Sequence, residues 1–298
     1  MSLFITGSSS GIGRSLALEL ARRSGGAIGL FARRAEVLAE VAEEVRAAGA
    51  TKVGVYPCDV ADREGYGAAL AKAESELGPC EVLINNAGAG HRAFVENTPS
   101  EHMPEVFGAN VFALWHGAAA VLPGMITRGR GHIITVSSIA GVMPFPGNAL
   151  YVAAKHAAVG FNRALRTELV GTGVEASVVL PAGVMTDWAT KTIGGSLLPL
   201  FEYEGKRGAE IAAEEGVEPP TMPPLLSSDE VAASIADLVD NPQPELYTHP
   251  DSAELVAMYR QDQGELERRL APFWKAHREG AIDGKDEGRG SRIEQTED

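Results

Sequence analysis

Short apolar runs alternate with amphipathic stretches along most of the chain. Runs rich in Ile, Val and Leu predict buried strands, and apolar residues three and four apart predict helices that pack on them. This alternation favours an α/β fold, a doubly wound Rossmann-type parallel sheet with helices on both faces. The expected strands are 3–5, 27–31, 53–56, 81–84, 133–136, 174–180 and 245–248; the expected helices are one ending near 23, 36–48, one from about 62, 99–126, 149–170, 229–239 and 252–271.

The pattern divides the chain into one main domain and two additions. Residues 1–248 form the expected dinucleotide-binding domain, whose first strand, 3–5, lies so near the start that we expect little room for pairing. Residues 187–226 mix Gly, Pro and acidic stretches with isolated apolar residues, which is typical of a lid or a disordered insert. Residues 249–279 are expected to be a C-terminal helical extension, and the charged, glycine-rich 280–298 a disordered tail.

The extension past residue 248 leaves two positions open for its helix at 252–271. The interpretation that we favour places this helix on the outside of the sheet as a packing element. The alternative is that it folds towards the lid and shapes the substrate pocket.

The composition is that of a globular protein with a large core. Of the 298 residues 45% are hydrophobic and 22% charged, and the net charge of −14 argues against nucleic acid or an anionic membrane surface as the main partner. No apolar run approaches the length of a bilayer span, so we expect no membrane insertion, and no signal peptide is visible. Cys58, Cys80 and the seven histidines show no metal-ligand spacing. We therefore expect a cytoplasmic enzyme without a metal.

A glycine-rich turn follows the first expected strand. Its glycines have the spacing Gly-x-x-x-Gly-x-Gly. Glycines allow the backbone to approach a dinucleotide pyrophosphate, and the next helix presents its N-terminal N–H groups to the anion. The residues expected to bind the pyrophosphate are Gly7, Ser9, Ser10, Gly11, Ile12 and Gly13.

The second expected strand ends in Ala32, Arg33 and Arg34. NAD-specific folds usually carry an acidic residue here for the ribose 2′-hydroxyl, whereas a guanidinium pairs with a 2′-phosphate. We therefore expect NADP(H) to be favoured over NAD(H), with Arg33 as the main contact and Arg34 beside it. The alternative is that both arginines only open the next helix on a solvated face.

The third and fourth expected strands end in residues that suit the rest of a dinucleotide. Asp59, which precedes Val60, can reach an adenine, or it can cap the helix that begins near Asp62. Asn86, Ala87 and Gly88 are small enough for the backbone to run alongside a cofactor.

A serine, a tyrosine and a lysine follow the fifth expected strand. Tyr151 and Lys155 lie four apart at the start of a helix and therefore share one face. A neighbouring cation lowers the pKa of a phenol from about 10, so Tyr151 is a candidate acid/base and Ser138 a candidate hydrogen-bond donor to a substrate oxygen. Asn110, an amide within an apolar helix, needs a partner, either a backbone group or a water leading towards Lys155.

In combination these motifs resemble the short-chain dehydrogenases/reductases, in their single-domain branch. The resemblance covers about residues 1–248 and implies a role for each matching residue. Tyr151 would be the general acid/base, and Lys155 would lower its pKa and bind the nicotinamide ribose. Ser138 would orient the carbonyl, and Asn110 would hold a water of the proton relay. The matching segments are Thr6 to Gly13, Asp59-Val60, Asn85 to Gly88, Asn110, Ser138, Tyr151-x-x-x-Lys155 and Pro181 to Thr186.

The resemblance also implies cofactor contacts. The three glycines of the turn would hold the pyrophosphate, Arg33 the 2′-phosphate, Asp59 the adenine, Asn86 the adenosine-side ribose and Thr186 the carboxamide. Ala182 stands where the family usually has Gly, so the backbone there would be less free, with Gly183 supplying flexibility. The remaining expected contacts are Val60, Ala87, Gly88, Tyr151, Lys155, Pro181 and Val184.

The expected function is the NADP(H)-dependent interconversion of a carbonyl and an alcohol on a small, apolar molecule. The expected substrate pocket is lined by 89–92, 143–146 and 187–226, with Ser138, Met143, Phe145 and Tyr151 at its centre. One alternative is an oxidative dehydrogenase of a steroid, retinoid or fatty-acyl alcohol. Another is a non-catalytic NADP-sensing protein, although such proteins typically lose the Tyr or the Lys. Relatives pair through the helices expected at 99–126 and 149–170, which implies a homodimer or homotetramer.

Overall fold

The computed structural model describes residues 1–282. Seven parallel strands form one sheet in the order β3-β2-β1-β4-β5-β6-β9, which confirms the predicted doubly wound α/β fold. The tail expected at 280–298 lies outside the described residues from 283 onwards, and residues 280–282 belong to the last helix. The strands are β1 (Ser2–Thr6), β2 (Ala27–Ala32), β3 (Lys52–Pro57), β4 (Val82–Asn85), β5 (Gly131–Val136), β6 (Val174–Leu180) and β9 (Glu245–Tyr247).

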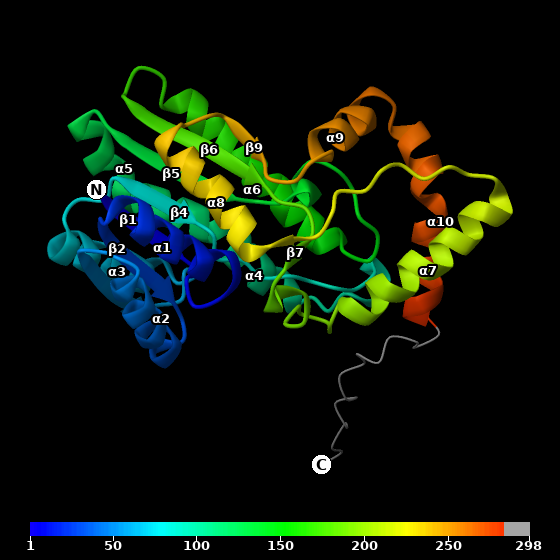
Figure 1. Cartoon of the computed structure of the whole chain (residues 1–298), viewed down its shortest axis with the longest axis horizontal. Helices are drawn as coiled ribbons and strands as arrows, with labels where there is room; N and C mark the ends of the chain where they lie inside the picture. The colour runs from blue at the N-terminus through cyan, green and yellow to red at the C-terminus, as the bar shows by residue number, and fades with distance from the viewer. Residues whose placement is uncertain (283–298) are drawn as a thin grey trace, which may run out of the picture.

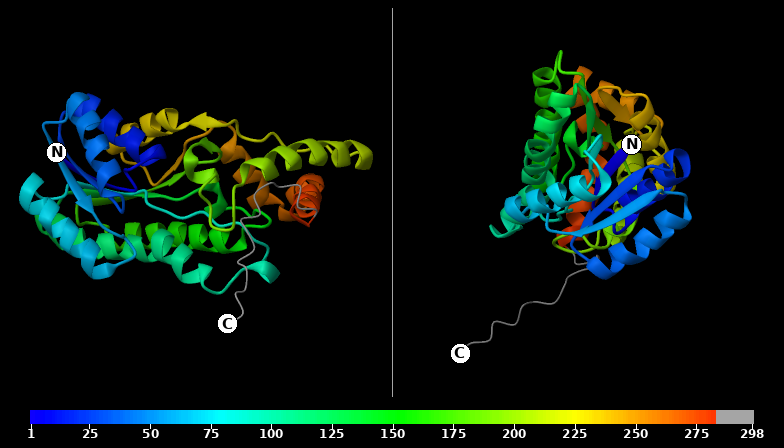
Figure 2. Two further views of the ribbon diagram at one scale, coloured as in Figure 1. Left: turned by 90° about the horizontal axis from the view of Figure 1, so that it is seen from below. Right: turned by 90° about the vertical axis from the view of Figure 1, so that its left-hand side faces the viewer.

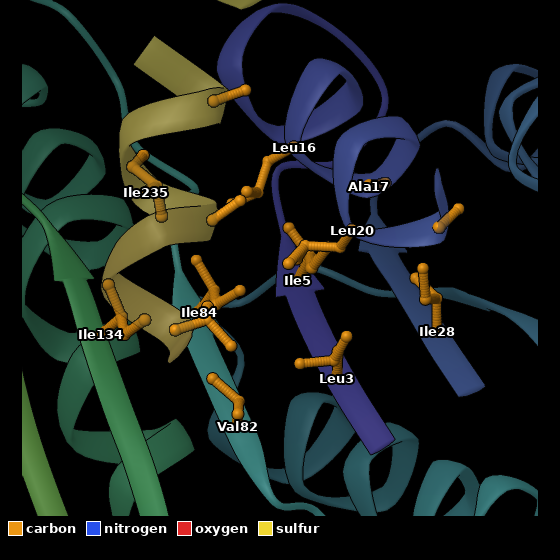
Figure 3. Close-up of a cluster of buried hydrophobic side chains, with 14 of the residues drawn as sticks. Leu3, Ile5, Leu16, Ala17, Leu20, Ile28, Val82, Ile84, Ile134 and Ile235 are labelled. Atoms are coloured by element: carbon orange, nitrogen blue, oxygen red, sulfur yellow. The ribbon is translucent and has the colours of Figure 1, made fainter. Parts of the chain in front are cut away.

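Two layers of helices cover the sheet (Figure 1). On one face α1 (Gly11–Ser24), α2 (Ala35–Ala47) and α8 (Ser228–Asp240) bury their apolar sides. Leu16, Leu20 and Ile235 from these helices meet Ile5 and Ile84 of the sheet (Figure 3). The other face carries α3 (Arg63–Leu77), α5 (Ala113–Arg128) and α6 (Ala149–Glu168).

Strand β1 pairs along its whole length, so the expectation that it had little room for pairing is wrong. Ser2 to Thr6 pair with Ala27 to Phe31 of β2, and Leu3 to Ile5 pair with Val82 to Ile84 of β4. A central position in the sheet gives even a short strand hydrogen bonds on both sides. The glycine turn after Thr6 is thereby held at the carboxyl edge, where ligands bind in such sheets.

The helix expected at 99–126 is divided by a π-turn. α4 (His102–Phe107) leads into the π-turn Gly108–Phe112, and α5 follows it directly. The whole run His102–Arg128 is long and apolar enough to span a membrane by length and composition, with a mean hydropathy of 1.4 and 44% of that window buried in the fold. This corrects the expectation that no apolar run reaches such a length.

The insert at 187–226 is structured between two short strands, β7 (Val184–Met185) and β8 (Leu226–Ser227), that pair with each other. It contains a 3₁₀ turn, η4 (Asp187–Ala189), and the long helix α7 (Leu198–Glu215). The structure therefore shows an ordered insert rather than a disordered one. α8 starts directly after β8 with a capping box between Ser227 and Glu230.

The C-terminal extension contains two helices, so the single helix expected at 252–271 is wrong. α9 (Ser252–Gln261) ends at Asp262, whose backbone is extended, and α10 (Gln263–Ile282) continues in a new direction. α10 lies alongside α7 at the end of the molecule opposite the N-terminus (Figures 1 and 2). α10 therefore packs on the insert, as the alternative had it, whereas Leu255 and Val256 of α9 belong to one apolar cluster with Val178 and Leu180 of β6, in line with packing against the sheet.

Candidate active site

The predicted serine, tyrosine and lysine meet at the carboxyl edge of the sheet. Ser138 follows β5, and its hydroxyl donates to the carbonyl oxygen of Pro181 at 3.3 Å and accepts from the Ala140 amide at 3.1 Å. A hydrogen bond joins the side chains of Ser138 and Tyr151. The short turn η3 (Ile139–Gly141) after β5 and the start of α6 thus place both hydroxyls side by side.

Lys155 is buried over the ring of Tyr151. Its ammonium donates to the carbonyl oxygen of Val136 at 3.2 Å and lies 5.6 Å from the centre of the Tyr151 ring. Burial lowers the pKa of Lys155 to about 8. Burial also raises the pKa of the Tyr151 phenol above its ordinary value, and the hydrogen bond with Ser138 opposes that rise. The expected lowering of the Tyr151 pKa by Lys155 is therefore not what this geometry gives, because desolvation dominates.

Asn110 supplies an unpaired acceptor to the same place. Its amide nitrogen donates to the carbonyl oxygens of Ala89 and Val106, both at 2.8 Å, while its Oδ1 is buried without a hydrogen-bond partner among the described residues. A methyl group added to Gly88 would lie 2.7 Å from that oxygen and 3.4 Å from the Lys155 nitrogen. The two partners expected for Asn110 therefore concern different atoms. Backbone carbonyl oxygens accept from its amide nitrogen, whereas its Oδ1 lies beside the position that a side chain at Gly88 would occupy, next to Lys155. π-turns such as the one around Asn110 often mark functional sites.

The glycine turn is packed too tightly for any side chain at two positions. A methyl group on Gly13 would collide with the carbonyl oxygen of Gly7, and one on Gly7 would lie 2.9 Å from the Cα of Ala87. Asn86 closes the turn, because its side-chain amide donates to the carbonyl oxygen of Thr6 at 2.9 Å. α1 begins at Gly11, so Gly11, Ile12 and Gly13 form its first turn and aim their N–H groups at the carboxyl edge, next to Ser9 and Ser10.

The two arginines after β2 differ in their contacts. Arg34 reaches the glycine turn and donates to the hydroxyl of Ser9 at 3.0 Å. Arg33 is exposed, and no hydrogen bond or ion pair of its side chain occurs within residues 1–282. Asp59 accepts from the Ala61 amide at 2.9 Å, whereas Asp62 is the residue that caps α3. Asp59 was expected either to contact an adenine or to cap α3. The cap of α3 is Asp62, so the capping role of Asp59 is wrong.

The segment after β6 crosses the glycine turn. A methyl group on Gly11 would lie 3.3 Å from the Cγ2 of Thr186, which places Thr186 over the start of α1. Thr186 in turn caps the 3₁₀ turn η4 by accepting from the Trp188 amide at 3.3 Å. Pro181, Gly183 and Val184 lie on the same crossing segment. Met143 and Phe145, expected in the pocket, pack in one cluster with apolar residues of α9 and α10.

Two residues of this site carried no recognisable motif. His249 accepts from the Ala182 amide at 3.2 Å through Nδ1 and donates to the carbonyl oxygen of Gly183 at 2.8 Å through Nε2. The imidazole thus fixes the turn in which Ala182 replaces the family's Gly. Trp188 lies against Tyr151, with ring centres 5.2 Å apart. In the sequence, the contact between Trp188 and Tyr151 is indicated only by an aromatic residue two positions after Thr186.

Comparison with known proteins bears on the whole domain. A family model described as short chain dehydrogenase matches residues 2–194. The uncharacterized oxidoreductase YusZ of Bacillus subtilis is 35% identical over 62% of this chain and 66% of its own length. Glycine betaine reductase ATRR of Emericella nidulans is 33% identical over 72% of this chain but only 16% of its own length. The chain thus spans no more than about two thirds of either relative.

Solved structures match over more of both chains. A short chain dehydrogenase/reductase from Burkholderia phymatum in complex with NAD is 26% identical, with a TM-score of 0.73 over 88% of this chain and 93% of that one. An alcohol dehydrogenase from Thermococcus sibiricus complexed with 5-hydroxy-NADP is 25% identical, with a TM-score of 0.68 over 83% and 95%. Similar folds therefore hold either type of dinucleotide.

Proposed function

We propose that this chain, which belongs to the short-chain dehydrogenase family, interconverts a carbonyl and an alcohol with NADP(H), using Tyr151 as its general acid/base. The observation that carries the proposal is the convergence of Ser138, Tyr151, Lys155 and the unpaired oxygen of Asn110 at one point of the carboxyl edge. The Oδ1 of Asn110 has no hydrogen-bond partner among the described residues, and a buried acceptor without a partner is costly unless a ligand or a water satisfies it.

A dinucleotide fits the residues that this chain presents. The crowded Gly7 and Gly13, the first N–H groups of α1 and the guanidinium of Arg34 lie around one glycine turn, which suits a pyrophosphate and a 2′-phosphate. Gly88 leaves free the space that its side chain would fill between Asn110 and Lys155. When bound there, the dinucleotide would supply or accept the hydride.

The protein's own groups would handle the proton. Ser138 donates a hydrogen bond to the carbonyl oxygen, and the Tyr151 hydroxyl gives the same oxygen its proton as the alcohol forms. The raised pKa of Tyr151 keeps the phenol protonated near neutrality, which suits this donor role. The pKa of about 8 lets Lys155 release and regain a proton near physiological pH, so it can restore the proton of Tyr151 through the space beside Asn110.

The first test is oxidation of NADPH and of NADH across aldehydes, ketones and quinones, with Tyr151→Phe as the matched variant. We expect turnover with NADPH that falls by about a thousandfold or more in the variant, because general acid catalysis and its orientation are lost together. Turnover that survives in Tyr151→Phe would overturn the assigned role. Binding of NADPH without any turnover in either direction would favour a nucleotide-sensing protein.

Oxidation of a lipid-like alcohol is the second candidate for the reaction. It uses the same groups in reverse, and the apolar Met143, Phe145 and Trp188 near the site suit such a substrate as well. Including steroid, retinoid and fatty-acyl alcohols with NADP and NAD in the assay distinguishes it from a small-carbonyl reductase.

A further inference from the structure

His277 connects α10 with three other parts of the molecule. Its imidazole is buried, and Nδ1 lies 3.1 Å from the Glu204 carboxylate on α7. Its ring stands edge-on to Phe94, 5.7 Å between centres. The opposite edge of the ring lies against Gly147, where a methyl group would come within 3.1 Å of the imidazole Cδ2. One side chain of the C-terminal extension therefore touches the insert, the segment after β4 and the loop before Tyr151.

Gly147 belongs to the loop 142–148, which links Ser138 to Tyr151. The φ angle of Gly147 is +64°, a conformation that strains any other residue, and its carbonyl oxygen accepts from the Ala93 amide at 3.0 Å. The imidazole of His277 thus closes the loop from outside at the point where the loop turns. A displaced imidazole would free the loop residues that precede the catalytic helix.

The helices that carry His277 and Glu204 form a rigid pair. Gly208 of α7 lies against Phe273, and Gly280 of α10 lies against Tyr203, because a methyl group at either glycine would overlap the opposite ring. Close helix approach of this kind keeps His277 in one position. Arg278, next along α10, adds a cation–π contact with Phe94 at 4.3 Å and an ion pair with Glu96 at 2.6 Å.

The same helix forms one apolar cluster with the loop. Leu266 and Leu270 of α10 are buried together with Met143, and Trp274 and Phe145 pack against this cluster. Met143 and Phe145 are the loop residues proposed to line the substrate pocket. The extension therefore supports the pocket wall from behind, and His277 fixes the end of that wall nearest Tyr151.

We propose that His277 is a positioning residue that, held by Glu204, fixes the loop 142–148 and thereby sets the size of substrate that reaches Tyr151. This inference rests on the proposed function. The C-terminal extension lies outside the segment 2–194 that the family model matches. The proposal gives this extension control of substrate size rather than a general stabilising role.

The test compares His277→Ala with Lys275→Ala. Lys275 is a matched control because it also pairs with α7, through Glu215 at 2.6 Å, but is exposed and belongs to neither the apolar cluster nor the contacts around Gly147. KM and kcat would be measured for a short aliphatic aldehyde and for a bulky aryl ketone, with NADPH affinity from fluorescence. In His277→Ala we expect the ratio of kcat/KM between the two substrates to change about tenfold through KM, with NADPH affinity unchanged. Lys275→Ala should leave the ratio as it is.

A conservative variant separates positioning from stability. Glu204→Gln keeps an oxygen that accepts from the imidazole, so it should retain the native substrate ratio, whereas Glu204→Ala should behave like His277→Ala. If His277→Ala fails to fold, His277→Gln, which retains a donor for Glu204 but lacks the ring, takes its place. Equal effects on both substrates, or a lowered Tm with an unchanged ratio, would overturn the proposal.

A measurement without turnover keeps this proposal distinct from the proposed function. Hydrogen–deuterium exchange over 142–150 should speed up in His277→Ala and not in Lys275→Ala, whether or not any substrate is turned over. Unchanged exchange in this loop would refute the positioning role. Faster exchange in a protein that neither reduces a carbonyl nor oxidises an alcohol would confirm the positioning and refute the proposed function instead.

Discussion

The indole ring of Trp188 and the phenol ring of Tyr151 lie 5.2 Å apart between centres, with their planes at 53°. The indole also covers Gly90, where a methyl group would lie 2.7 Å from the ring. Trp188 belongs to the insert, and Tyr151 belongs to the catalytic helix. A residue without a family motif therefore contributes directly to the desolvation that raises the pKa of Tyr151.

Trp188→Ala should shift the pH dependence of alcohol oxidation to lower pH. Oxidation requires the phenolate, and exposing Tyr151 to water lowers its pKa towards the ordinary value, so kcat/KM begins to rise at a lower pH. We also expect kcat/KM for apolar substrates to fall about tenfold, because an aromatic wall is lost. The pH profile of kcat/KM measures both effects. Val170→Ala, a change at an exposed position after the end of α6, should leave the profile unchanged.

Lys155→Met should stabilise the fold at pH 7 more than at pH 10. The pKa of Lys155 is lowered from 10.5 to about 8, so folding an ammonium at this site costs free energy below pH 8. As the pH rises from 8 to 10.5 the native state releases this proton before the unfolded state does, and the wild type regains stability. The difference in free energy of unfolding between Lys155→Met and the wild type should therefore be smaller at pH 10 than at pH 7, by an amount on the order of 2 to 3 kcal/mol.

Urea unfolding of both proteins at pH 7 and pH 10 measures this difference. The lost hydrogen bond to Val136 lowers the stability of the variant at both pH values, so it cancels from the comparison. A gain that is the same at both pH values would mean that Lys155 keeps its proton in the native state throughout this range.

The sheet could be predicted from the sequence because its strands are local apolar runs and its motifs lie at strand ends. The π-turn could not, since a single-residue slip of helical hydrogen bonds around Asn110 leaves the apolar pattern intact. The break between α9 and α10 falls at Asp262, and the nearest glycine, Gly264, lies inside the first turn of α10 and so does not mark the end of α9. Within the insert, Gly205 and Gly208 concealed α7, although Gly208 is what allows close packing on Phe273.

The site shows the same division between local and distant information. Ser138, Tyr151 and Lys155 meet because one strand end and one helix start fix them within a short stretch. His249 binds Gly183 from 66 positions away, and His277 meets Glu204 across 73 positions. Such contacts depend on how the extension packs in three dimensions. Likewise, the pKa of Tyr151 depends on how deeply the phenol is buried, and this cannot be predicted from its sequence spacing to Lys155.

Arg34→Ala should weaken NADPH use more than Arg33→Ala does. Both side chains are exposed, but Arg34 reaches Ser9 in the glycine turn, whereas Arg33 makes no such contact within residues 1–282. A charge-assisted contact with a 2′-phosphate corresponds to a rise of about 10- to 100-fold in the KM for NADPH, with little change for NADH. Steady-state kinetics with both cofactors measures this. A larger effect in Arg33→Ala would restore the original assignment, and no effect in either would favour NAD.

Trp115→Glu should dissociate the protein into monomers. Trp115 is 65% exposed and lies against Phe161, 5.4 Å between ring centres, and Phe112 beside it is 51% exposed. These aromatic side chains form an apolar surface over α5 and α6, the helices through which we propose that two copies pair. Sedimentation should show a dimer or tetramer for the wild type and a monomer for the variant.

Met222→Glu is the matched control for this surface, because Met222 is also about half exposed but lies outside these helices. It should leave the assembly intact. A wild-type monomer that binds lipid vesicles would instead assign the apolar side of the run His102–Arg128 to a membrane surface. A monomer that does not bind vesicles would refute both roles for this surface.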